Sequence, residues 1–435
     1  MKGKTKPKDS METALNRIMQ RSKDNQNVEF RWLMPHYNPW YLYECFNKLD
    51  GKKAVGIDGV TKDDYKENIG VNLKTLVSKM KRMAYRPQPV KEVLIPKEGQ
   101  KGKTRPLGIS VFEDKIVQLL TSKILEAIYE PVFRECSYGF RPNRNCHSVI
   151  KKVIDRLYVN RYAVVIDVDI KNFFGTINHQ KLVELLRIKI KDDTFIRYIV
   201  RMLKAGVLCD GELRKSEEGS PQGNVASPIL ANIYAHYAID VWFEDVVKEY
   251  TKGNVELYRY CDDLLICCEE DTDAERIKRA LIGRLYKYGL ELNQEKTRMV
   301  RIDKRSGNRK TFDFLGFTFY LGKSRKGVVV PKVRTSKKRL RMKLKRVNEW
   351  CKKYRCSIKL RQLWQIFRSK VRGHMQYYSV STNLFRVKQF VKQAVKIFFK
   401  WMNRRSQKRS LSWDKFNKFL IKYPLPKIRV YVKLF

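Results

Sequence analysis

The sequence predicts an α+β fold, on the strength of three observations. Two nearly continuous apolar runs, residues 163–170 and 257–268, are rich in branched and aromatic residues, which is typical of buried strands. Acids interrupt both runs: Asp167 lies in the first, and Asp262 and Asp263 lie in the second. In the last hundred residues, apolar side chains recur at helical spacing instead.

The charge balance indicates a polyanionic partner. The 435 residues include 92 Lys and Arg against 45 Asp and Glu, a formal net charge of +47. Such an excess favours nucleic acid bound over a large surface. A membrane surface is the competing explanation, but the charge is spread along the whole chain rather than gathered in one amphipathic segment. A hydrophobic content of 43% excludes a disordered basic tail as the main body.

The cysteines and the apolar runs limit the classes of protein to which the chain can belong. The nine cysteines are odd in number and include no Cys-x-x-Cys pair, so neither a disulfide framework nor a zinc site is indicated. The protein is therefore expected in a reducing compartment. The chain begins with a Lys-rich segment that has no apolar run behind it, unlike a secretory signal. No stretch approaches the ~20 apolar residues that span a bilayer, so no membrane partner is expected.

The first fifty residues hold a basic arm, residues 1–10, and an aromatic cluster. Between them, apolar residues from Met11 to Met19 follow helical spacing. The cluster can stack on bases or pack as a small N-terminal subdomain, and packing is the preferred interpretation. Its members are Trp32, Tyr37, Trp40, Tyr41 and Tyr43.

Two short strands, residues 90–95 and 107–109, are joined by a turn rich in Gly and Lys. Lys97, Lys103 and Arg105 are expected to project from this hairpin. Arg can grip phosphate oxygens bidentately while Lys acts as a point charge, so the three cations suit a triphosphate. A basic hairpin that is merely solvated explains the spacing equally well.

A helix is predicted over residues 113–134, and a turn with an exposed Arg141 follows it. Arg141 could contact a template or primer phosphate. A structural turn explains the neighbouring Gly139 and Pro142 equally well.

The acids of the two central strands indicate a metal centre. An Asp-Asp pair alone is common in solvated turns, but Asp167 on a second strand argues against that interpretation. Together with Asp262 and Asp263 it could hold two Mg²⁺ ions about 4 Å apart, the arrangement used for in-line phosphoryl displacement. Asp169 faces the same side as Asp167 because strand side chains alternate. It ranks below Asp167 as a possible extra ligand, because the other acids already complete a triad.

Two further segments adjoin these strands. A bulky ring just past the first, Phe173 or Phe174, could exclude a ribose 2′-hydroxyl, although at least one of the two must belong to the core. The turn-rich loop of residues 219–228, which opens a helix ending near residue 244, carries Gln222, which is suited to touch a nucleotide sugar or base.

The remaining chain is predicted to hold a helix over residues 272–288, Lys296 beside a strand, and a single aromatic strand over residues 312–319. Three amphipathic helices with basic outer faces follow and would lie along a duplex backbone. Candidate contacts on the first of them are Lys337, Lys338, Arg341 and Lys345. The basic C-terminal end can bind folded RNA or be solvated, and RNA is favoured.

Taken in order, these segments resemble a bacterial group II intron-encoded reverse transcriptase, the maturase family. The resemblance runs from about residue 51 to the C-terminus, and the following motifs carry it: Ile-Pro-Lys97, Arg-Pro-Leu-Gly-Ile109, Tyr-Gly-Phe-Arg-Pro142, Asp167, Phe-Phe174, Pro-Gln-Gly223, Tyr-Cys-Asp-Asp263, Leu-Asn-x-Glu-Lys-Thr297 and Phe-Leu-Gly-Phe317.

The resemblance implies a right-hand polymerase fold of fingers, palm and thumb. It places an N-terminal extension at 1–50, fingers with the start of the palm at 51–160, and the palm at 161–325. The thumb, or maturase domain, is then 326–410 and a short basic nucleic-acid-binding tail is 411–435. The family's optional C-terminal endonuclease needs a set of His and Cys ligands, so with five His in all the chain resembles the lineage that lacks it.

The resemblance also assigns residues to roles. It implies that Asp167, Asp262 and Asp263 are catalytic and hold the two Mg²⁺ ions, with Val168 as a further metal ligand. The deoxynucleotide site would be formed by Lys97, Lys103, Arg105, Phe173 and Gln222, with Phe173 preferred to Phe174 as the 2′-hydroxyl gate. Nucleic acid would contact Arg141, Lys296 and the four thumb cations.

Three departures from the family pattern are visible. Cys261 stands where the family usually has Ala, Gly175 where it has Asp, and Asn224 where it has a second Gly. The first should fit the same hairpin, whereas the other two affect loop conformation rather than the triad.

The expected function is RNA-directed DNA polymerisation by an intron-encoded protein that also assists splicing and retrohoming. Its expected partners are intron RNA, an RNA template, a DNA primer or target and dNTPs, in a cytoplasmic, nucleoid-associated setting and as a monomer or a dimer. Two alternatives stay open: a domesticated relative serving phage defence, spacer acquisition or repair, and a non-catalytic RNA-binding splicing cofactor. Three intact acids argue against the second alternative, because a disused site has no reason to keep them.

Overall fold

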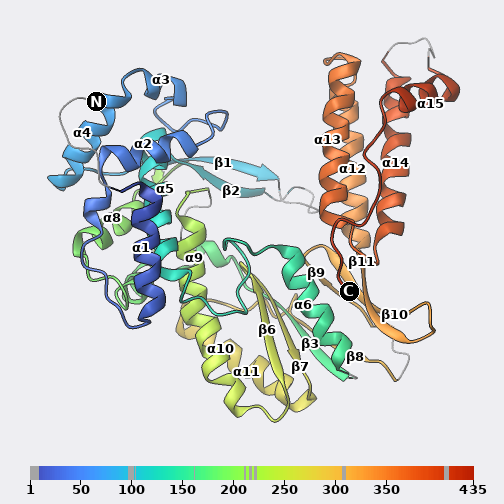
Figure 1. The fold of residues 1–435 in the computed structure, drawn as a ribbon, viewed down its shortest axis with the longest axis horizontal. Helices are drawn as coiled ribbons and strands as arrows, with labels where there is room; N and C mark the ends of the chain where they lie inside the picture. Colours follow the sequence, from blue (N-terminus) through green and yellow to red (C-terminus); the bar gives the residue numbers. More distant parts are fainter. Residues whose placement is uncertain are drawn as a thin grey trace. The chain divides into compact units, whose positions relative to one another are not determined.

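The computed structural model describes residues 9–96, 102, 104–160, 162–209, 212–214, 218–219, 223–305, 310–405 and 411–435. The chain divides into two compact units, which Figure 1 shows as a ribbon. Unit 1 comprises residues 1–145 and 168–298, and unit 2 comprises residues 146–167 and 299–435. The finer five-part division expected from the sequence stays a prediction.

Unit 1 is built around the buried helix α5. The helix spans Phe112–Tyr129, and Ile116, Leu120 and Ile124 on it are fully buried. It ends two residues before Pro131, which has no N–H group with which to continue the helical hydrogen bonds. Helices α1 and α2 pack against it. The helices of unit 1 are α1 Met11–Asp24, α2 Pro39–Lys48, α3 Lys62–Glu67, α4 Ile69–Lys81, α5, α7 His179–Leu186, α8 Asp193–Leu203, α9 Ser227–Ala235, α10 Val241–Asp245 and α11 Asp271–Lys287, with short η1 Met34–His36, η2 Phe173–Gly175, η3 His236–Asp240 and η4 Val247–Tyr250.

A four-stranded sheet in unit 1 has the strand order β2-β1-β4-β5. The predicted hairpin is confirmed as β1 Val90–Pro96 and β2 Thr104–Ile109, which pair in antiparallel fashion with Ile95 opposite Arg105. Strand β4 Val207–Cys209 joins β1 in parallel, and β5 Glu212–Arg214 pairs with β4. The hairpin is thus anchored by a strand from much later in the sequence.

The acidic hairpin is also confirmed. Strands β6 Val255–Tyr260 and β7 Asp263–Cys268 pair in antiparallel fashion, with Tyr260 opposite Asp263. They belong to a sheet of order β6-β7-β3-β8, in which β3 is Tyr162–Asp169 and β8 is Arg298–Asp303. Every residue of β7 after Asp263 is buried. These residues are aliphatic side chains and free cysteines, and a free cysteine behaves as a small hydrophobic residue.

Unit 2 contains the predicted three-helix array. Helices α12 Lys337–Tyr354, α13 Leu360–Tyr378 and α14 Leu384–Met402 run side by side in Figure 1. Trp364, Phe367 and Phe398 form the centre of their core, and α15 Trp413–Lys422 adds the buried Phe416. The unit also holds α6 Cys146–Val159 and a sheet of order β11-β10-β9, whose strands are β9 Phe312–Phe314, β10 Phe317–Lys323 and β11 Val329–Thr335.

One predicted element is wrong. Residues 312–319 do not form one strand but the hairpin β9–β10, in which Phe314 pairs with Phe317. Leu315 and Gly316 between them both have positive φ, of 48° and 80°. Two central residues with positive φ are characteristic of the tight type I′ hairpin turn, which favours glycine. Phe314 and Phe317 are three residues apart, so the aromatic alternation changes phase at the turn, and this change together with Gly316 was the available sign of it.

The predicted packing of the aromatic cluster is confirmed only in part. Tyr37 and Tyr41 are buried, which confirms packing for that part of the aromatic cluster, but the Trp32 side chain is 83% exposed.

None of the helices in the described residues is long and apolar enough to cross a membrane.

Candidate active site

The site is built on the turn between β6 and β7. Asp262 and Asp263 are exposed at the end of a hairpin whose body is buried. The turn residue before them, Cys261, has a φ of 61°. Both carboxylates therefore reach the surface from a rigid base, which suits ligands that must be held in place.

Asp169 brings a further negative charge to this turn in unit 1. The surrounding protein removes part of the hydration of Asp262, and this desolvation raises the pKa of its carboxyl group. The charge of Asp169 raises that pKa further, against a backbone hydrogen bond that lowers it. The Lys296 Nζ atom lies 3.1 Å from the Asp169 Oδ2 atom, so Lys296 lies beside a strand as predicted, but as the partner of an acid. Asp169, which sequence reasoning ranked below Asp167, is thus an acid whose charge acts on Asp262.

Asp167 lies two residues before Asp169 on β3 and belongs to unit 2. It is half-buried, and because strand side chains alternate it leaves the sheet on the same face as Asp169. The side chain of Val168 is buried and carries no ligand atom, so only its backbone carbonyl could bind a metal. Among the described residues no three His, Cys, Asp or Glu side chains are grouped as a metal centre, so the triad stays a prediction.

The two rings after β3 differ in exposure. Phe173 is buried and Phe174 is half-buried, and they meet edge to face with ring centroids 5.6 Å apart. At least one ring therefore belongs to the core, as expected, and that ring is Phe173. Its role as the 2′-hydroxyl gate stays a prediction. At Gly175 a Cβ atom would lie 2.2 Å from the Asn172 Nδ2 atom, so a side chain there would require the Asn172 amide to move.

The loop after β5 lies against the β1–β2 hairpin. Gly223 has a φ of 111°, and a Cβ atom there would lie 2.3 Å from the backbone oxygen of Gly108 on β2. The Asn224 Oδ1 atom accepts a hydrogen bond from the Ala226 N–H at 2.9 Å, so an amide side chain shapes the loop where the family usually has glycine. The structure thus brings two of the predicted nucleotide-binding segments together. Arg105 is exposed on β2, whereas Lys97, Lys103 and Gln222 lie outside the described residues.

The predicted exposure of Arg141 is wrong. Its side chain is 3% exposed, and its guanidinium pairs with both carboxylate oxygens of Glu130 at 2.9–3.1 Å. Further N–H groups donate to the backbone oxygens of Arg134 and Ser137, at 2.8 and 2.9 Å. The guanidinium is used inside the protein, because the turn that carries it needs donors for its buried carbonyl groups.

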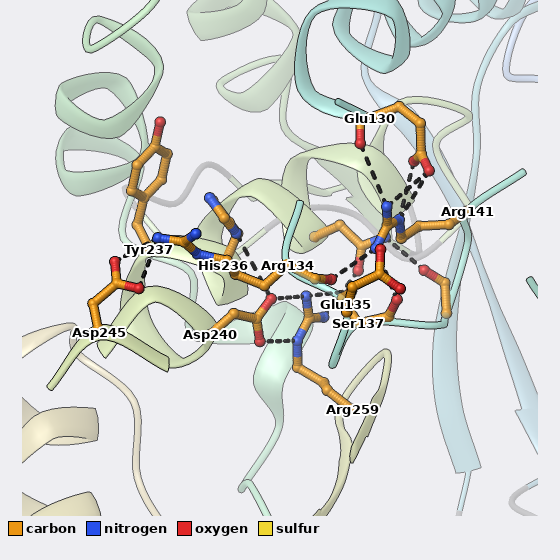
Figure 2. A network of polar contacts seen from close by, with 12 residues as sticks. Glu130, Arg134, Glu135, Ser137, Arg141, His236, Tyr237, Asp240, Asp245 and Arg259 are labelled. Atoms are coloured by element: carbon orange, nitrogen blue, oxygen red, sulfur yellow. Dashed lines mark hydrogen bonds and ion pairs between the residues drawn. The ribbon is translucent and has the colours of Figure 1, made fainter. Parts of the chain in front are cut away.

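Sequence reasoning also missed a second buried arginine, Arg259 on β6. Its Nε and Nη2 atoms donate to the two carboxylate oxygens of Asp240 at 2.6 and 2.5 Å, and Figure 2 shows the two side chains facing one another. Neither side chain is more than 1% exposed. Burial and nearby arginines lower the pKa of His236 to about 3, so this neighbour of Asp240 is neutral. The available signal was an arginine within the apolar run that leads to the acidic turn, since a buried arginine must find a buried partner.

The predicted thumb cations lie on α12 in unit 2. Lys337, Lys338, Arg341 and Lys345 are all exposed, and Lys345 pairs loosely with Glu349 at 3.7 Å. Between α12 and α14 lies a groove of about 300 Å³. Its lining includes Arg386, a cation on α14 that sequence reasoning did not single out.

Together these features define a mixed α+β protein that displays acids at the end of a buried hairpin and cations on a helical array. The model of the reverse transcriptase (RNA-dependent DNA polymerase) family matches residues 95–319, which is more than half of the chain. The chain belongs to this family. Reverse transcriptases in general use divalent metal ions and act on nucleic acid.

Individual relatives show which reverse transcriptases the chain resembles. The chain is 38% identical over 226 residues to the group II intron-encoded protein LtrA of Lactococcus lactis, in an alignment that covers 51% of this chain and 37% of that protein. It is 33% identical over 307 residues to protein YkfC of Escherichia coli, covering 64% of this chain and 78% of that one. The chain thus spans little more than a third of the length of LtrA. The resemblance to group II intron reverse transcriptases is confirmed.

Proposed function

We propose that the chain is an RNA-directed DNA polymerase encoded by a group II intron, and that it also binds intron RNA to assist splicing and retrohoming. One observation carries the proposal. Within the stretch that matches the reverse transcriptase family, Asp262 and Asp263 are exposed at the end of a buried hairpin. Its substrates are then an RNA template, a DNA primer or target and dNTPs.

The proposed architecture is the right hand of polymerases. Residues 51–160 form the fingers with the start of the palm, residues 161–325 the palm, and residues 326–410 the thumb, between the N-terminal extension of residues 1–50 and the basic tail of residues 411–435. The exposed Arg105 on the fingers hairpin supports a triphosphate site shared with Lys97, Lys103, Phe173 and Gln222. The exposed cations of α12 support contact with a nucleic-acid backbone.

The proposed metal is Mg²⁺, bound as two ions by Asp262, Asp263 and Asp167, with the Val168 carbonyl as a further ligand. The donor set fits, because hard carboxylate oxygens are what Mg²⁺ prefers and it needs few of them. Asp169 joins this proposal, since its charge already acts on Asp262. When bound, the ions would supply Lewis-acid stabilisation of in-line phosphoryl displacement. The chain's own part is to hold the carboxylates on rigid strands.

Primer extension on an RNA template tests the proposal. Asp262→Asn keeps the shape of the side chain but removes a negative ligand, so it should lower the extension rate by several orders of magnitude. The matched control is Asp245→Asn, an exposed aspartate that pairs with Arg134 and should leave the rate unchanged. Extension by the Asp262→Asn variant at close to the parent rate contradicts the assignment.

The same assay decides between the acids of β3. If the sequence-based triad is correct, Asp167→Asn abolishes extension. If Asp169 is the ligand that accompanies Asp262, Asp169→Asn does so and Asp167→Asn has the smaller effect. A chain that binds RNA but shows no extension with any divalent metal would favour a non-catalytic splicing cofactor.

A further inference from the structure

We propose that Arg259 and Asp240 are positioning residues for the carboxylate turn. Their buried ion pair fixes the conformation of Cys261, and thereby the place that Asp262 and Asp263 occupy. The inference rests on the proposed function, because the carboxylates are taken to be the metal-binding groups of the polymerase. It assigns a role to two residues that do not themselves touch substrate.

The turn needs external support because its backbone is strained. Cys261 and Asp262 are the two residues between the paired Tyr260 and Asp263, and of the two only Cys261 has a positive φ. This sign pattern is that of a type II′ turn, whose first central position normally holds glycine. A residue with a side chain there costs roughly 1–2 kcal/mol, so surrounding contacts must hold it in place.

Arg259 supplies one of these contacts directly. Its Nη1 atom donates to the backbone oxygen of Cys261 at 3.2 Å and to the Asn232 Oδ1 atom at 3.0 Å. Its Nη2 atom also donates to the Ser137 Oγ atom at 2.7 Å. With the two bonds to Asp240, the five N–H donors of the guanidinium meet five acceptors. Lysine, with three donors on a flexible stem, cannot reproduce this arrangement.

The segment at Gly139 makes a second contact with the turn. A Cβ atom at Gly139 would lie 2.4 Å from both the backbone nitrogen and the Sγ atom of Cys261, so the chain at Gly139 packs directly on the turn. The Asn232 Nδ2 atom donates to the Gly139 oxygen at 2.7 Å. Asn232 therefore links Arg259 to the segment that covers Cys261, and the turn is held between them.

The position of Asp240 depends on an irregular helix. Residues His236–Asp240 form a π-helical turn between α9 and α10. Each residue of a regular α-helix advances about 100° around the axis, so the extra residue of a π-turn changes the direction in which the following side chains leave the helix. Single π-turns inside helices recur at functional sites. A buried ion pair adds little net stability compared with apolar residues of similar volume, so geometry is the better explanation for this one.

The experiment compares a double variant with the parent chain. Arg259→Met/Asp240→Leu replaces the pair by apolar side chains, which folding tolerates better than loss of one partner. If the pair positions the turn, this variant unfolds within a few degrees of the parent but extends primers about 100-fold more slowly, the cost of a misplacement near 1 Å. The KM for dNTP should stay within about threefold of the parent value, because the nucleotide site proposed on the β1–β2 hairpin is not altered. The half-saturating Mg²⁺ concentration should rise severalfold.

Two further variants close the test. Arg134→Met/Asp245→Leu removes an exposed pair of the same network, shown in Figure 2, and should change neither rate nor Mg²⁺ dependence. Arg259→Lys keeps the charge, and should fold normally yet recover only part of kcat. If the double variant does not fold, Arg259→Lys decides alone, and parent-like kcat overturns the proposal. A folded Arg259→Met/Asp240→Leu variant with parent-like kcat also overturns the proposal. Inactivity of the parent chain itself would refute the proposed function instead.

Discussion

The Nζ atom of Lys296 lies 3.1 Å from the Oδ2 atom of Asp169, and the charge of Asp169 in turn acts on Asp262. Lys296 thus offsets one negative charge next to the proposed metal site. Lys296→Met should lower the half-saturating Mg²⁺ concentration about two- to threefold, because a cation that competes with the metal is gone; the effect is small because the pair is exposed and screened. Initial extension rates measured against MgCl₂ check this. Lys171→Met, which removes the exposed partner of Glu291, should shift the concentration less.

Replacement of the aromatic rings should change the choice of sugar. Phe173→Ala removes a ring proposed to lie against C2′, and should raise ribonucleotide incorporation relative to deoxynucleotide incorporation. Because Phe173 is buried, the substitution should also destabilise the protein by about 3–5 kcal/mol. Phe174→Ala is the matched control. A rise in ribonucleotide use with Phe174→Ala alone would transfer the role to the half-exposed ring.

Charge reversal on α12 should separate RNA binding from polymerisation. Replacing Lys337, Lys338 and Arg341 by Glu removes three exposed cations, whereas Lys345 is left because Glu349 already accompanies it. Each lost phosphate contact should flatten the log–log salt dependence of intron binding by about 0.7–0.9, hence by up to about 3 in all. Splicing support should fall more than primer extension on a saturating short template.

The control for this experiment is reversal of Arg276, Arg279 and Lys287 on α11, three exposed cations that give the same change in net charge. If the salt dependence of intron binding flattens equally in both triple variants, overall charge rather than the thumb surface governs binding. Asp262→Asn should show the opposite behaviour, with intron binding kept and extension lost.

Asp114 should make stability depend on pH. Burial raises its pKa to about 7, against hydrogen bonds from the Tyr85 hydroxyl and the Gln88 N–H that lower it. An acid whose pKa is higher in the folded than in the unfolded state favours folding when protonated. The free energy of unfolding should therefore fall as pH rises from about 4 to about 7, by an amount on the order of 4 kcal/mol from this group.

Urea unfolding of the parent and of Asp114→Asn across that pH range measures the effect. Asn cannot ionise, so the variant should lose the decline and overtake the parent near neutral pH. Parallel curves for the two proteins would show that Asp114 titrates at an ordinary pH.

Periodicity predicted most of the architecture, because helix and strand patterns are local. The acidic hairpin, the β1–β2 hairpin and the three helices of unit 2 all follow from runs of apolar residues at spacings of two or about 3.6. The prediction failed at Leu315 and Gly316, where a turn of two residues separates two short aromatic strands. The glycine and the spacing of three between Phe314 and Phe317 were the signs of the break.

The site was harder to predict, because side-chain partners are not local. The turn sequence predicted an exposed Arg141, yet Glu130 and two carbonyl groups hold its side chain inside. Asp240, the partner of Arg259, lies in a π-turn that no spacing rule predicts. The acids of the turn were found because carboxylates in apolar strands are costly, whereas the side chains that support them look ordinary in the sequence.

The parallel pairing of Val90 with Val207 has a consequence for synthesis of the protein on the ribosome. The β1–β2 hairpin can form early, but its third strand emerges only after many seconds of translation at about 5–20 residues per second. Unit 1 is interrupted by residues 146–167 and is completed only at residue 298, so its N-terminal half must wait with apolar surface uncovered. Nascent chains that stall between these points should engage chaperones, and synonymous codons that slow elongation there should lower the yield of folded protein.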